Sequence, residues 1–396
     1  MDKIDELLTR GVDKIYPTKE ELETLLKSGK KLRVYQGFDP TSPELHIGHL
    51  LGLRKLRQWQ DLGHEVIFLI GDFTGMIGDP TGKDKTRTEL THEQVLENAK
   101  TYKEQAAKIL SFDGENPVLI KYNGDWLEKL SAIEFARLTS YFTIQQLIER
   151  DMFQKRLKND MNIAMSEFSY PLMQAYDSVA MDVDVEIGGS DQMFNMMIGR
   201  QLMHKMKRKN KFVMTMPLLT DSEGKKIGKS EGNAIALTDK PEELYGKIMG
   251  LSDDVITKCL EYLTDVSMEE ISEIQSKITG GENPVQFKKK LAFEIVKQLN
   301  DENSAKQAAE HFEKTVQHKE TPEEMQTFPF EIDGTITDVM LATNLATSKA
   351  EAKRLIEQGG VAVDEVIVTD PNMPIKVTGE KIIRVGKRKF VKIKSS

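Results

Sequence analysis

Residues 32–72, LRVYQGFDPTSPELHIGHLLGLRKLRQWQDLGHEVIFLIGD, determine the fold class. The segments 32–38 and 65–72 are short and apolar, and the segment between them has helical periodicity from 46 until it closes at Gly63. A strand, a helix and a buried second strand form a βαβ unit of a parallel sheet. Further strands are predicted at 116–123, 183–189 and 211–217, with helical segments around 91–111, 125–150, 170–182 and 191–208. We therefore predict an α/β fold built on a Rossmann-like, doubly wound parallel sheet.

The composition is that of an ordinary protein of the cytoplasm, which is the location we expect. No apolar stretch approaches the ~20 residues needed to span a bilayer, and the N-terminal segment MDKIDELLTRG is typical of an amphipathic helix rather than a secretory signal. The single cysteine, Cys259, excludes an intrachain disulfide and is too little thiol for a zinc cluster. We expect no membrane contact, no zinc and no metal held by protein ligands.

The pattern changes along the chain and predicts three domains, because 396 residues exceed what one core usually serves. Residues 1–232 would form the sheet domain. Residues 233–320 are charged and helical, and would form a small helical domain. Residues 321–333 are expected to be a linker, and residues 334–396 read as two short helices followed by the strands VAVDEVIV and KIIRVGKRKFVKI, an α+β module.

The net charge of −8 is distributed unevenly. Residues 334–396 carry +4, which leaves −12 on the rest of the chain. A basic module on an acidic body favours a polyanion partner at that end. A solvated basic edge that improves solubility is about as good an explanation on charge alone.

The HIGH run at 46–49 places two histidines three residues apart at the start of a helix. A zinc pair is unfavoured, because the usual helical pair is H-E-x-x-H at i and i+4. The first turn of a helix offers unpaired backbone N–H groups that suit an anion, and His46 and His49 can donate to phosphate oxygens. Gly48 removes a side chain, which would let a purine pack against the backbone. The alternative is a pair of half-buried capping histidines with no ligand.

The segment KKIGKS at 225–230 brings Lys226 and Lys229 into a glycine-punctuated loop. It is not a Walker A loop, because Glu223 stands where that motif needs glycine. Two ammonium groups in one loop suit the charge that builds on a pyrophosphate leaving group. A solvated surface loop is the alternative.

HIGH near the start of an α/β domain and KIGKS at its end together resemble the signatures of the class I aminoacyl-tRNA synthetases. Ile227 and Gly228 depart from the usual KMSKS, a departure tolerated in the bacterial tyrosyl branch of that class. The resemblance to that branch covers essentially the whole chain, through VYQGFDPTSPELHIGHL (34–50), GDFTGMIGDPTGK (71–83), YPLMQAYDSVAMDVDVEIGGSDQ (170–192) and a C-terminal module similar to an S4 RNA-binding domain. It implies that residues 233–320 lie on the anticodon side.

The resemblance also implies which residues bind the amino acid tyrosine. Tyr35 and Asp177 would contact its phenolic hydroxyl, and Asp79, Tyr170 and Gln174 its ammonium group. Gln192 would contact the substrate or the ribose of the adenylate.

The resemblance implies further residues for ATP and RNA. The residues for the nucleotide and its phosphates are Gly37, Asp39, Thr41, His46, Gly48 and His49. Those for the pyrophosphate are Lys83, Arg87, Lys226 and Lys229. The basic residues expected to bind RNA are Lys349, Lys353, Arg354, Arg384, Lys387 and Arg388. Gln36 departs from many relatives, which have cysteine there contacting the ribose.

The spacing of three of these residues supports the resemblance independently. Tyr170, Gln174 and Asp177 fall at i, i+4 and i+7, so they share one face of a helix. Their neighbours, such as Leu172 and Val179, are apolar. Polar groups on a mostly buried helix need partners, and a bound ligand is one.

The function implied is that of a tyrosine–tRNA ligase, which activates L-tyrosine with ATP to tyrosyl-adenylate and pyrophosphate, then transfers tyrosine to the terminal adenosine of tRNA(Tyr). Mg²⁺ would be carried with ATP, and the family is homodimeric, with residues 133–157 as the interface candidate. An interior helix pair explains 133–157 equally well. Two alternatives stay open: a tryptophanyl-tRNA synthetase, and a non-catalytic RNA-binding protein that kept the fold.

Overall fold

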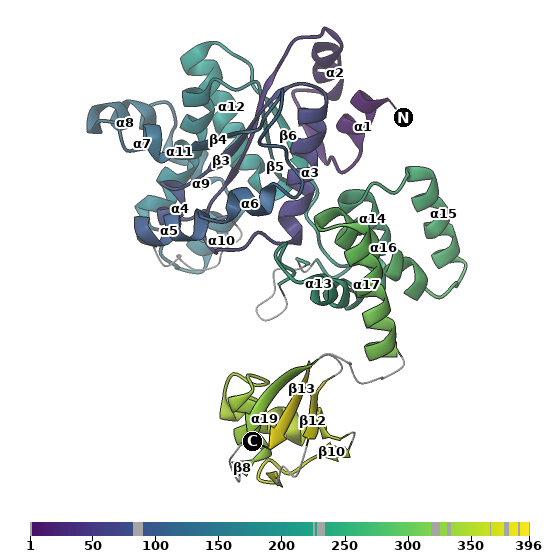
Figure 1. Cartoon of the computed structure of the whole chain (residues 1–396). Coiled ribbons are helices and arrows are strands. Elements are labelled where there is room, and N and C mark those ends of the chain that lie inside the picture. Colours follow the sequence, from purple (N-terminus) through teal and green to yellow (C-terminus); the bar gives the residue numbers. More distant parts are fainter. Residues whose placement is uncertain are drawn as a thin grey trace. The chain divides into compact units, whose positions relative to one another are not determined.

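A computed structural model describes residues 2–81, 90–224, 226–227, 234–317, 325–330, 334–364, 366–375, 380–386 and 389–395. The chain divides into two compact units, Met1–Glu302 and Asn303–Ser396 (Figure 1). Among the described residues, no helix is both long enough and apolar enough to cross a membrane. The domain boundaries at 232, 320 and 333 stay predictions.

The first unit is built around a six-stranded sheet with the strand order β1-β6-β5-β2-β3-β4. Neighbouring strands are parallel except for β1, which pairs antiparallel with β6. The α/β prediction is confirmed, and each of the five predicted strands is present. Only β1 had no prediction. The strands are β1 (Lys14–Tyr16), β2 (Arg33–Phe38), β3 (Glu65–Ile70), β4 (Leu119–Tyr122), β5 (Val185–Gly189) and β6 (Phe212–Met216).

The order of the strands creates a switch point between β2 and β5. From β2 the chain proceeds to β3 and β4 on one side, and from β5 it proceeds to β6 on the other side. Connections that leave in opposite directions open a crevice at the carboxyl ends of the two central strands. A ligand site is therefore expected beyond Phe38 and Gly189.

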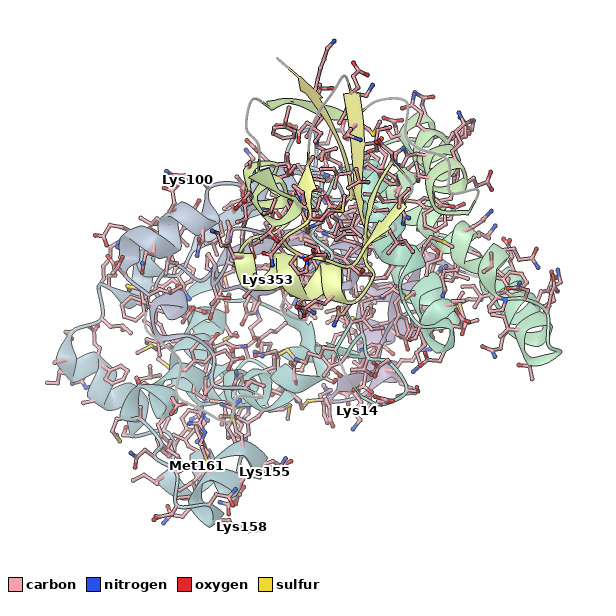
Figure 2. All side chains as sticks on the ribbon, turned by 90° about the horizontal axis from the view of Figure 1, so that it is seen from below. Lys14, Lys100, Lys155, Lys158, Met161 and Lys353 are labelled. Atoms are coloured by element: carbon pink, nitrogen blue, oxygen red, sulfur yellow. The ribbon has the colours of Figure 1, made fainter. Side chains whose placement is uncertain are left out.

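Helices surround this sheet (Figure 1). The long α11 packs against α12 through a core that includes Leu172, Val179, Ile198 and Leu202. The short α10 carries Lys155 and Lys158, whose exposed side chains project outward (Figure 2). The helices are α1 (Lys3–Thr9), α2 (Lys19–Lys27), α3 (Ile47–Asp61), α4 (Thr74–Ile77), α5 (His92–Ala99), α6 (Tyr102–Ala106), α7 (Gly124–Leu127), α8 (Ala132–Thr139), α9 (Ile144–Ile148), α10 (Asp151–Lys158), α11 (Met165–Met181), the short η1 (Ser190–Gln192) and α12 (Met193–Lys207).

Residues 241–299 are mainly helical, as the sequence predicts. The elements of this segment are α13 (Pro241–Met249), η2 (Asp253–Val255), α14 (Ile256–Leu263), α15 (Met268–Thr279) and α16 (Val285–Leu299). Cys259 is fully buried on α14, and burial raises the pKa of its thiol to about 12. The structure therefore supports a packing role for this cysteine.

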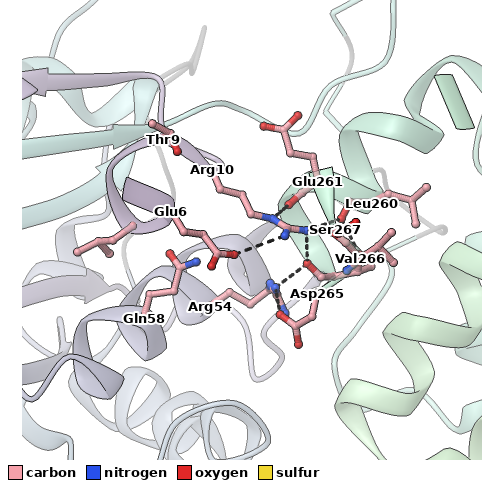
Figure 3. A network of polar contacts seen from close by, with 12 residues as sticks. Glu6, Thr9, Arg10, Arg54, Gln58, Leu260, Glu261, Asp265, Val266 and Ser267 are labelled. Atoms are coloured by element: carbon pink, nitrogen blue, oxygen red, sulfur yellow. Dashed lines mark hydrogen bonds and ion pairs between the residues drawn. The ribbon is translucent and has the colours of Figure 1, made fainter. Parts of the chain in front are cut away.

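Two arginines fasten α14 to the sheet part of the unit (Figure 3). The buried Arg10 guanidinium donates to the carbonyl oxygens of Glu261 at 2.8 Å, Thr264 at 2.7 Å and Val266 at 2.7 Å. Arg54, on α3, donates to the same Thr264 carbonyl at 2.6 Å and pairs with Asp265. The last carbonyls of a helix have no partner within the helix, so these arginines satisfy groups that would otherwise be buried unpaired.

The second unit begins within α17 (Glu302–Phe312) and contains a five-stranded sheet in the order β10-β9-β12-β13-β7. Its core includes Ile336, Val339, Ile356 and Ile383, all fully buried. The α+β prediction for this module is confirmed. Its other elements are η3 (Glu313–Gln317), β7 (Gln326–Phe330), β8 (Gly334–Thr335), α18 (Ile336–Ala342), α19 (Lys349–Glu357), β9 (Val361–Val363), β10 (Val366–Val368), β11 (Pro374–Ile375), β12 (Glu380–Val385) and β13 (Lys389–Ser395).

The second unit differs from the sequence prediction in two details. VAVDEVIV and KIIRVGKRKFVKI are each a pair of antiparallel strands rather than one strand. Asp364 and Gly386 have positive φ angles of 48° and 63°, which tight turns require. Part of the expected linker, Gln326–Phe330, is the strand β7, which pairs parallel with β13 at the edge of the sheet, where a proline is tolerated.

Candidate active site

A cavity of about 280 Å³ lies at the switch point, at the carboxyl ends of β2 and β5. Most of the residues predicted to bind tyrosine or ATP line it. They are Tyr35, Gly37, Asp39, Thr41, His46, Gly48, His49, Asp79, Tyr170, Gln174, Asp177, Gln192 and Lys226. The predicted Lys83, Arg87 and Lys229 lie outside the described residues.

His46 and His49 form a reciprocal cap at the start of α3. His46 Nδ1 accepts from the Gly48 N–H at 3.1 Å, and His49 Nδ1 accepts from the His46 N–H at 3.0 Å. The two rings stack with their centroids 3.9 Å apart. A ring nitrogen that accepts carries no proton, so in the neutral rings the proton lies on Nε2. Each histidine therefore caps the helix with one nitrogen and can act as a donor with the other.

The expected unpaired N–H groups at this helix start are absent from residues 47–49, so that part of the prediction is wrong. Ile47 N–H donates to the Ile235 carbonyl at 2.8 Å, and His49 N–H donates to the His46 carbonyl at 2.8 Å. Gly48 N–H is taken by the His46 ring. An anion bound at this helix start would therefore contact imidazole N–H donors rather than unpaired backbone N–H groups.

Gly48 has a second reason to be glycine. A Cβ at this position would lie 2.9 Å from Cε1 of His46, closer than Cβ atoms come to other groups. The glycine therefore makes room for the capping ring, in addition to any room that it leaves for a ligand. Gly52 likewise makes room for Gln36, because a Cβ on Gly52 would collide with the Gln36 amide. The Oε1 atom of that amide is buried without a hydrogen-bond partner.

The predicted shared face of α11 is present, and its three polar residues line one wall of the cavity. Tyr170 Oη donates to Asp39 Oδ2 at 2.7 Å. Gln174 Nε2 donates to Glu186 Oε1 at 3.1 Å. Asp177 accepts from Trp126 Nε1 at 2.8 Å and from Asn123 Nδ2 at 3.3 Å.

Tyr35 and Asp177 are both buried, with exposed fractions of 1% and 2%. Burial raises the pKa of Tyr35 well above its ordinary value, so this phenol stays protonated and can donate. Burial also raises the pKa of Asp177 well above the usual range, against the donations from Trp126 and Asn123 that favour the carboxylate. Tyr35 Oη lies 2.9 Å from Ser178 Oγ. A hydroxyl group that entered here would meet a donor and an acceptor in a pocket with little water.

Asp79, Gln192 and Lys226 line the cavity with partners already in place. Asp79 Oδ2 accepts from Gln192 Nε2 at 2.5 Å, and its Oδ1 accepts from Thr81. Lys226 Nζ pairs with Asp191 Oδ2 at 2.8 Å, with about half of the lysine side chain exposed. A cation bound near Asp79 and an anion bound near Lys226 would each meet a group of opposite charge.

Several residues at the site have no prediction from the sequence. Asn123 and Trp126 hold Asp177. Asn123 is the last residue of the strand predicted at 116–123 and Trp126 comes three residues later, at the end of a strand where site residues of parallel sheets gather. Glu186 and Lys211 are charged residues in or beside apolar strands. A charge in such a segment is the sequence signal from which a buried polar role could have been inferred. Both are buried, and they form an ion pair.

The basic residues predicted for RNA lie in the second unit. Lys349, Lys353 and Arg354 are exposed on α19, and Arg384 lies on β12, where it donates to the Gly386 carbonyl at 2.9 Å. Lys387 and Arg388 lie outside the described residues.

Comparisons with known proteins show the family of the chain. Residues 27–317 match the family of tRNA synthetases class I (W and Y), and residues 337–382 match the S4 domain. The chain is 45% identical to the tyrosine–tRNA ligase of Thermotoga maritima over 98% of this chain and 96% of that protein. It is 44% identical to the tyrosine–tRNA ligase of Geobacter sulfurreducens over 98% and 97% of the two chains.

A solved structure shows the same fold. It is that of a C-terminally truncated mitochondrial tyrosyl-tRNA synthetase of Aspergillus nidulans, with a TM-score of 0.65 and 25% identity over 78% of this chain and 92% of that chain. Together with the match over residues 27–317, this places the chain in a known family. The chain belongs to the class I tRNA synthetases (W and Y), with an S4 domain at residues 337–382.

Proposed function

We propose that this chain is a tyrosine–tRNA ligase that activates L-tyrosine with ATP and transfers it to tRNA(Tyr). The observation that carries the proposal is the α11 wall. It brings Tyr170, Gln174 and Asp177 into one cavity with Tyr35, beside the two histidines that cap α3. A buried donor and acceptor face a phenolic hydroxyl, and polar groups farther along the wall face an ammonium group.

In the first step, a carboxylate oxygen of tyrosine forms a bond to the α-phosphorus of ATP, and the bond from that phosphorus to pyrophosphate breaks. In the second step, a ribose hydroxyl of the tRNA terminus displaces AMP from the tyrosyl carbonyl. Neither step needs a side-chain nucleophile. Catalysis would come from placing the reactants and from donors that meet the charge on the phosphate oxygens.

The histidines and lysines supply those donors. The Nε2–H groups of His46 and His49 would meet phosphate oxygens, and Lys226 would exchange its contact with Asp191 for the departing pyrophosphate. We propose the same pyrophosphate role for Lys83, Arg87 and Lys229, and a nucleotide-binding role for Gly37, Asp39, Thr41 and Gly48.

Mg²⁺ would arrive with ATP. Over the described part of the chain, no group of three or more histidine, cysteine, aspartate or glutamate side chains could hold a metal ion. We propose the phosphates of ATP as its main ligands, because Mg²⁺ is usually bound by substrate phosphates with only one or two carboxylates. We propose no role for zinc and derive no step through a metal.

A homodimer in the cytoplasm is the proposed working form. Large apolar side chains are exposed along α8–α11 and the connections between these helices: Ile133, Ile144, Leu157, Met161 and Met165, with exposed fractions of 37–78%. Figure 2 labels Met161 close to Lys155 and Lys158. We propose that these side chains form one surface that a second copy of this chain covers, since a contiguous exposed apolar patch is typical of an interface.

The two alternatives fit less well. A tryptophanyl enzyme would have no use for the buried Tyr35 and Asp177 pair, and a purely RNA-binding protein would have no use for a cavity lined by both signatures. The three experiments below separate these readings.

Asp177→Ala should reduce the preference for tyrosine over phenylalanine. In the wild-type protein, bound phenylalanine would lack the hydrogen bonds that the hydroxyl of tyrosine makes to Tyr35 and Asp177, each worth ~1–3 kcal/mol. Removing one of the two groups should lower the ratio of kcat/KM for tyrosine to that for phenylalanine by about one to two powers of ten. The measurement is amino-acid-dependent exchange of pyrophosphate into ATP. Asp125→Ala, exposed on α7, is the control, and an unchanged ratio in Asp177→Ala would mean that Asp177 does not recognise the hydroxyl.

Two substitutions of His46 should separate its cap from its chemistry. His46→Ala removes both the helix cap and the Nε2 donor. It should lower the free energy of unfolding by about 1 kcal/mol, the usual value of a cap. His46→Asn keeps a good capping residue and should unfold almost as the wild type does. Both should slow tyrosine activation by about 10²–10³-fold, since both lose the Nε2 donor. Activity near the wild-type rate in His46→Asn would assign the histidine to the cap alone.

Removing the second sheet should abolish tRNA charging but not activation. The chain should be cut after Gln317 rather than at 334. A cut at 334 would keep β7 while removing β13, the strand with which β7 pairs. Among the described residues, those that line the cavity all come before 228, so pyrophosphate exchange should persist. Charging of tRNA(Tyr) is the second measurement, at ~150 mM salt, where electrostatic binding is weakened. Full charging by the shortened protein would exclude this module as the RNA site.

A further inference from the structure

A buried ion pair lies at the wall of the cavity, with Glu186 among the residues that line it. Glu186 on β5 and Lys211, the residue before β6, have side chains that are 3% and 0% exposed. Lys211 Nζ also donates to Ser178 Oγ at 2.9 Å. Gly199 on α12 leaves the space for this pair, because a Cβ there would lie 2.5 Å from Lys211 Nζ and 3.3 Å from Glu186 Oε2.

Glu186 contacts both halves of the α11 wall. Its Oε1 accepts from Gln174 Nε2 at 3.1 Å. Its Oε2 accepts from Lys211 and lies 3.4 Å from Ser178 Oγ, which in turn lies 2.9 Å from Tyr35 Oη. One carboxylate therefore connects the residue proposed for the ammonium group with the residue proposed for the hydroxyl.

The amide of Gln174 can take only one orientation beside this carboxylate. An ionised carboxylate has acceptors and no donor, so the NH₂ group of Gln174 must face Glu186. The amide oxygen then faces away from Glu186, and Gln174 Oε1 is buried without a hydrogen-bond partner. A buried acceptor without a partner, on a residue that lines the cavity, calls for a donor from the ligand.

We propose that Glu186, held by Lys211, is a positioning residue that keeps the Gln174 amide oxygen turned toward the ammonium group of the amino acid. This inference rests on the proposed function. Lys211 Nζ donates to Glu186 Oε2 and Gln174 Nε2 donates to Glu186 Oε1, so both oxygens of this buried side chain act as acceptors. A neutral group at 186 could donate as well as accept, and the Gln174 amide could then turn its NH₂ group toward the substrate ammonium.

Glu186→Gln is the first test, because it keeps the size of the side chain and adds a donor. We expect the KM for tyrosine to rise about tenfold or more, as for the loss of a hydrogen bond to a charged group, with kcat changed less than about threefold. The inhibition constant of 3-(4-hydroxyphenyl)propionate, which lacks the amino group, should stay within about twofold of the wild-type value, the change expected where no hydrogen bond is lost. Weakening of both compounds to the same extent would overturn the proposal, since the pair would then act only on the shape of the cavity.

A double variant separates orientation from the cost of an unpaired charge. Glu186→Gln leaves Lys211 buried without its partner and should lower the free energy of unfolding. Glu186→Gln with Lys211→Met removes both charges, so stability should recover while the KM for tyrosine stays high. If both the stability and the KM for tyrosine of the double variant returned to the wild-type values, the proposal would also be overturned.

Glu167→Gln is the matched control. Glu167 on α11 forms a buried ion pair at 2.8 Å with Arg156 on α10, but neither residue lines the cavity. This variant should lose stability without a change in the KM for tyrosine. Wild-type exchange is measured first: no tyrosine-dependent exchange would refute the proposed function, whereas normal wild-type exchange with an unchanged KM in Glu186→Gln would refute this inference alone.

Discussion

The buried polar face of α11 is the constraint on which the rest of the site depends. Tyr170, Asp177 and Ser178 lie in a part of the protein with little water, and each must have a hydrogen-bond partner there. The partners come from different strands and loops: Asp39 after β2, Asn123 after β4, and Glu186 on β5. The order of the strands and the position of α11 are thus coupled, because a shifted strand would leave one of these groups unpaired at a cost of ~1–3 kcal/mol.

The helix α3 connects this site with the helical segment of the same unit. Its first residues line the cavity and cap their own helix, and Arg54 farther along holds the carbonyl end of α14 together with Arg10. One rigid element therefore carries the histidines at one end and the attachment of α14 near its middle. Helical hydrogen bonds along α3 keep the distance between the two places fixed.

The sequence predicts those parts of the fold and of the site that leave a periodic pattern or a family motif. Five strands, the main helical segments between them and the shared face of Tyr170, Gln174 and Asp177 follow from spacing alone, because a side chain's face is set by the geometry of its own element. The helices α2 and α4 had no prediction. The two hairpins of the second unit do not follow, since an apolar run of eight residues with one Asp-Glu step fits one long strand or two short ones. The pairing of Glu186 with Lys211 is a contact across β5 and β6, and no local pattern specifies it.

The orientation of L-tyrosine in the cavity is the central claim, and a crystal structure of the full chain with bound L-tyrosine tests it most directly. We predict the phenolic oxygen within hydrogen-bond distance of Tyr35 Oη and Asp177, and the ammonium nitrogen within hydrogen-bond distance of Gln174 Oε1. Tyrosine bound outside this cavity, or bound with its hydroxyl toward the histidines, would contradict the proposed site.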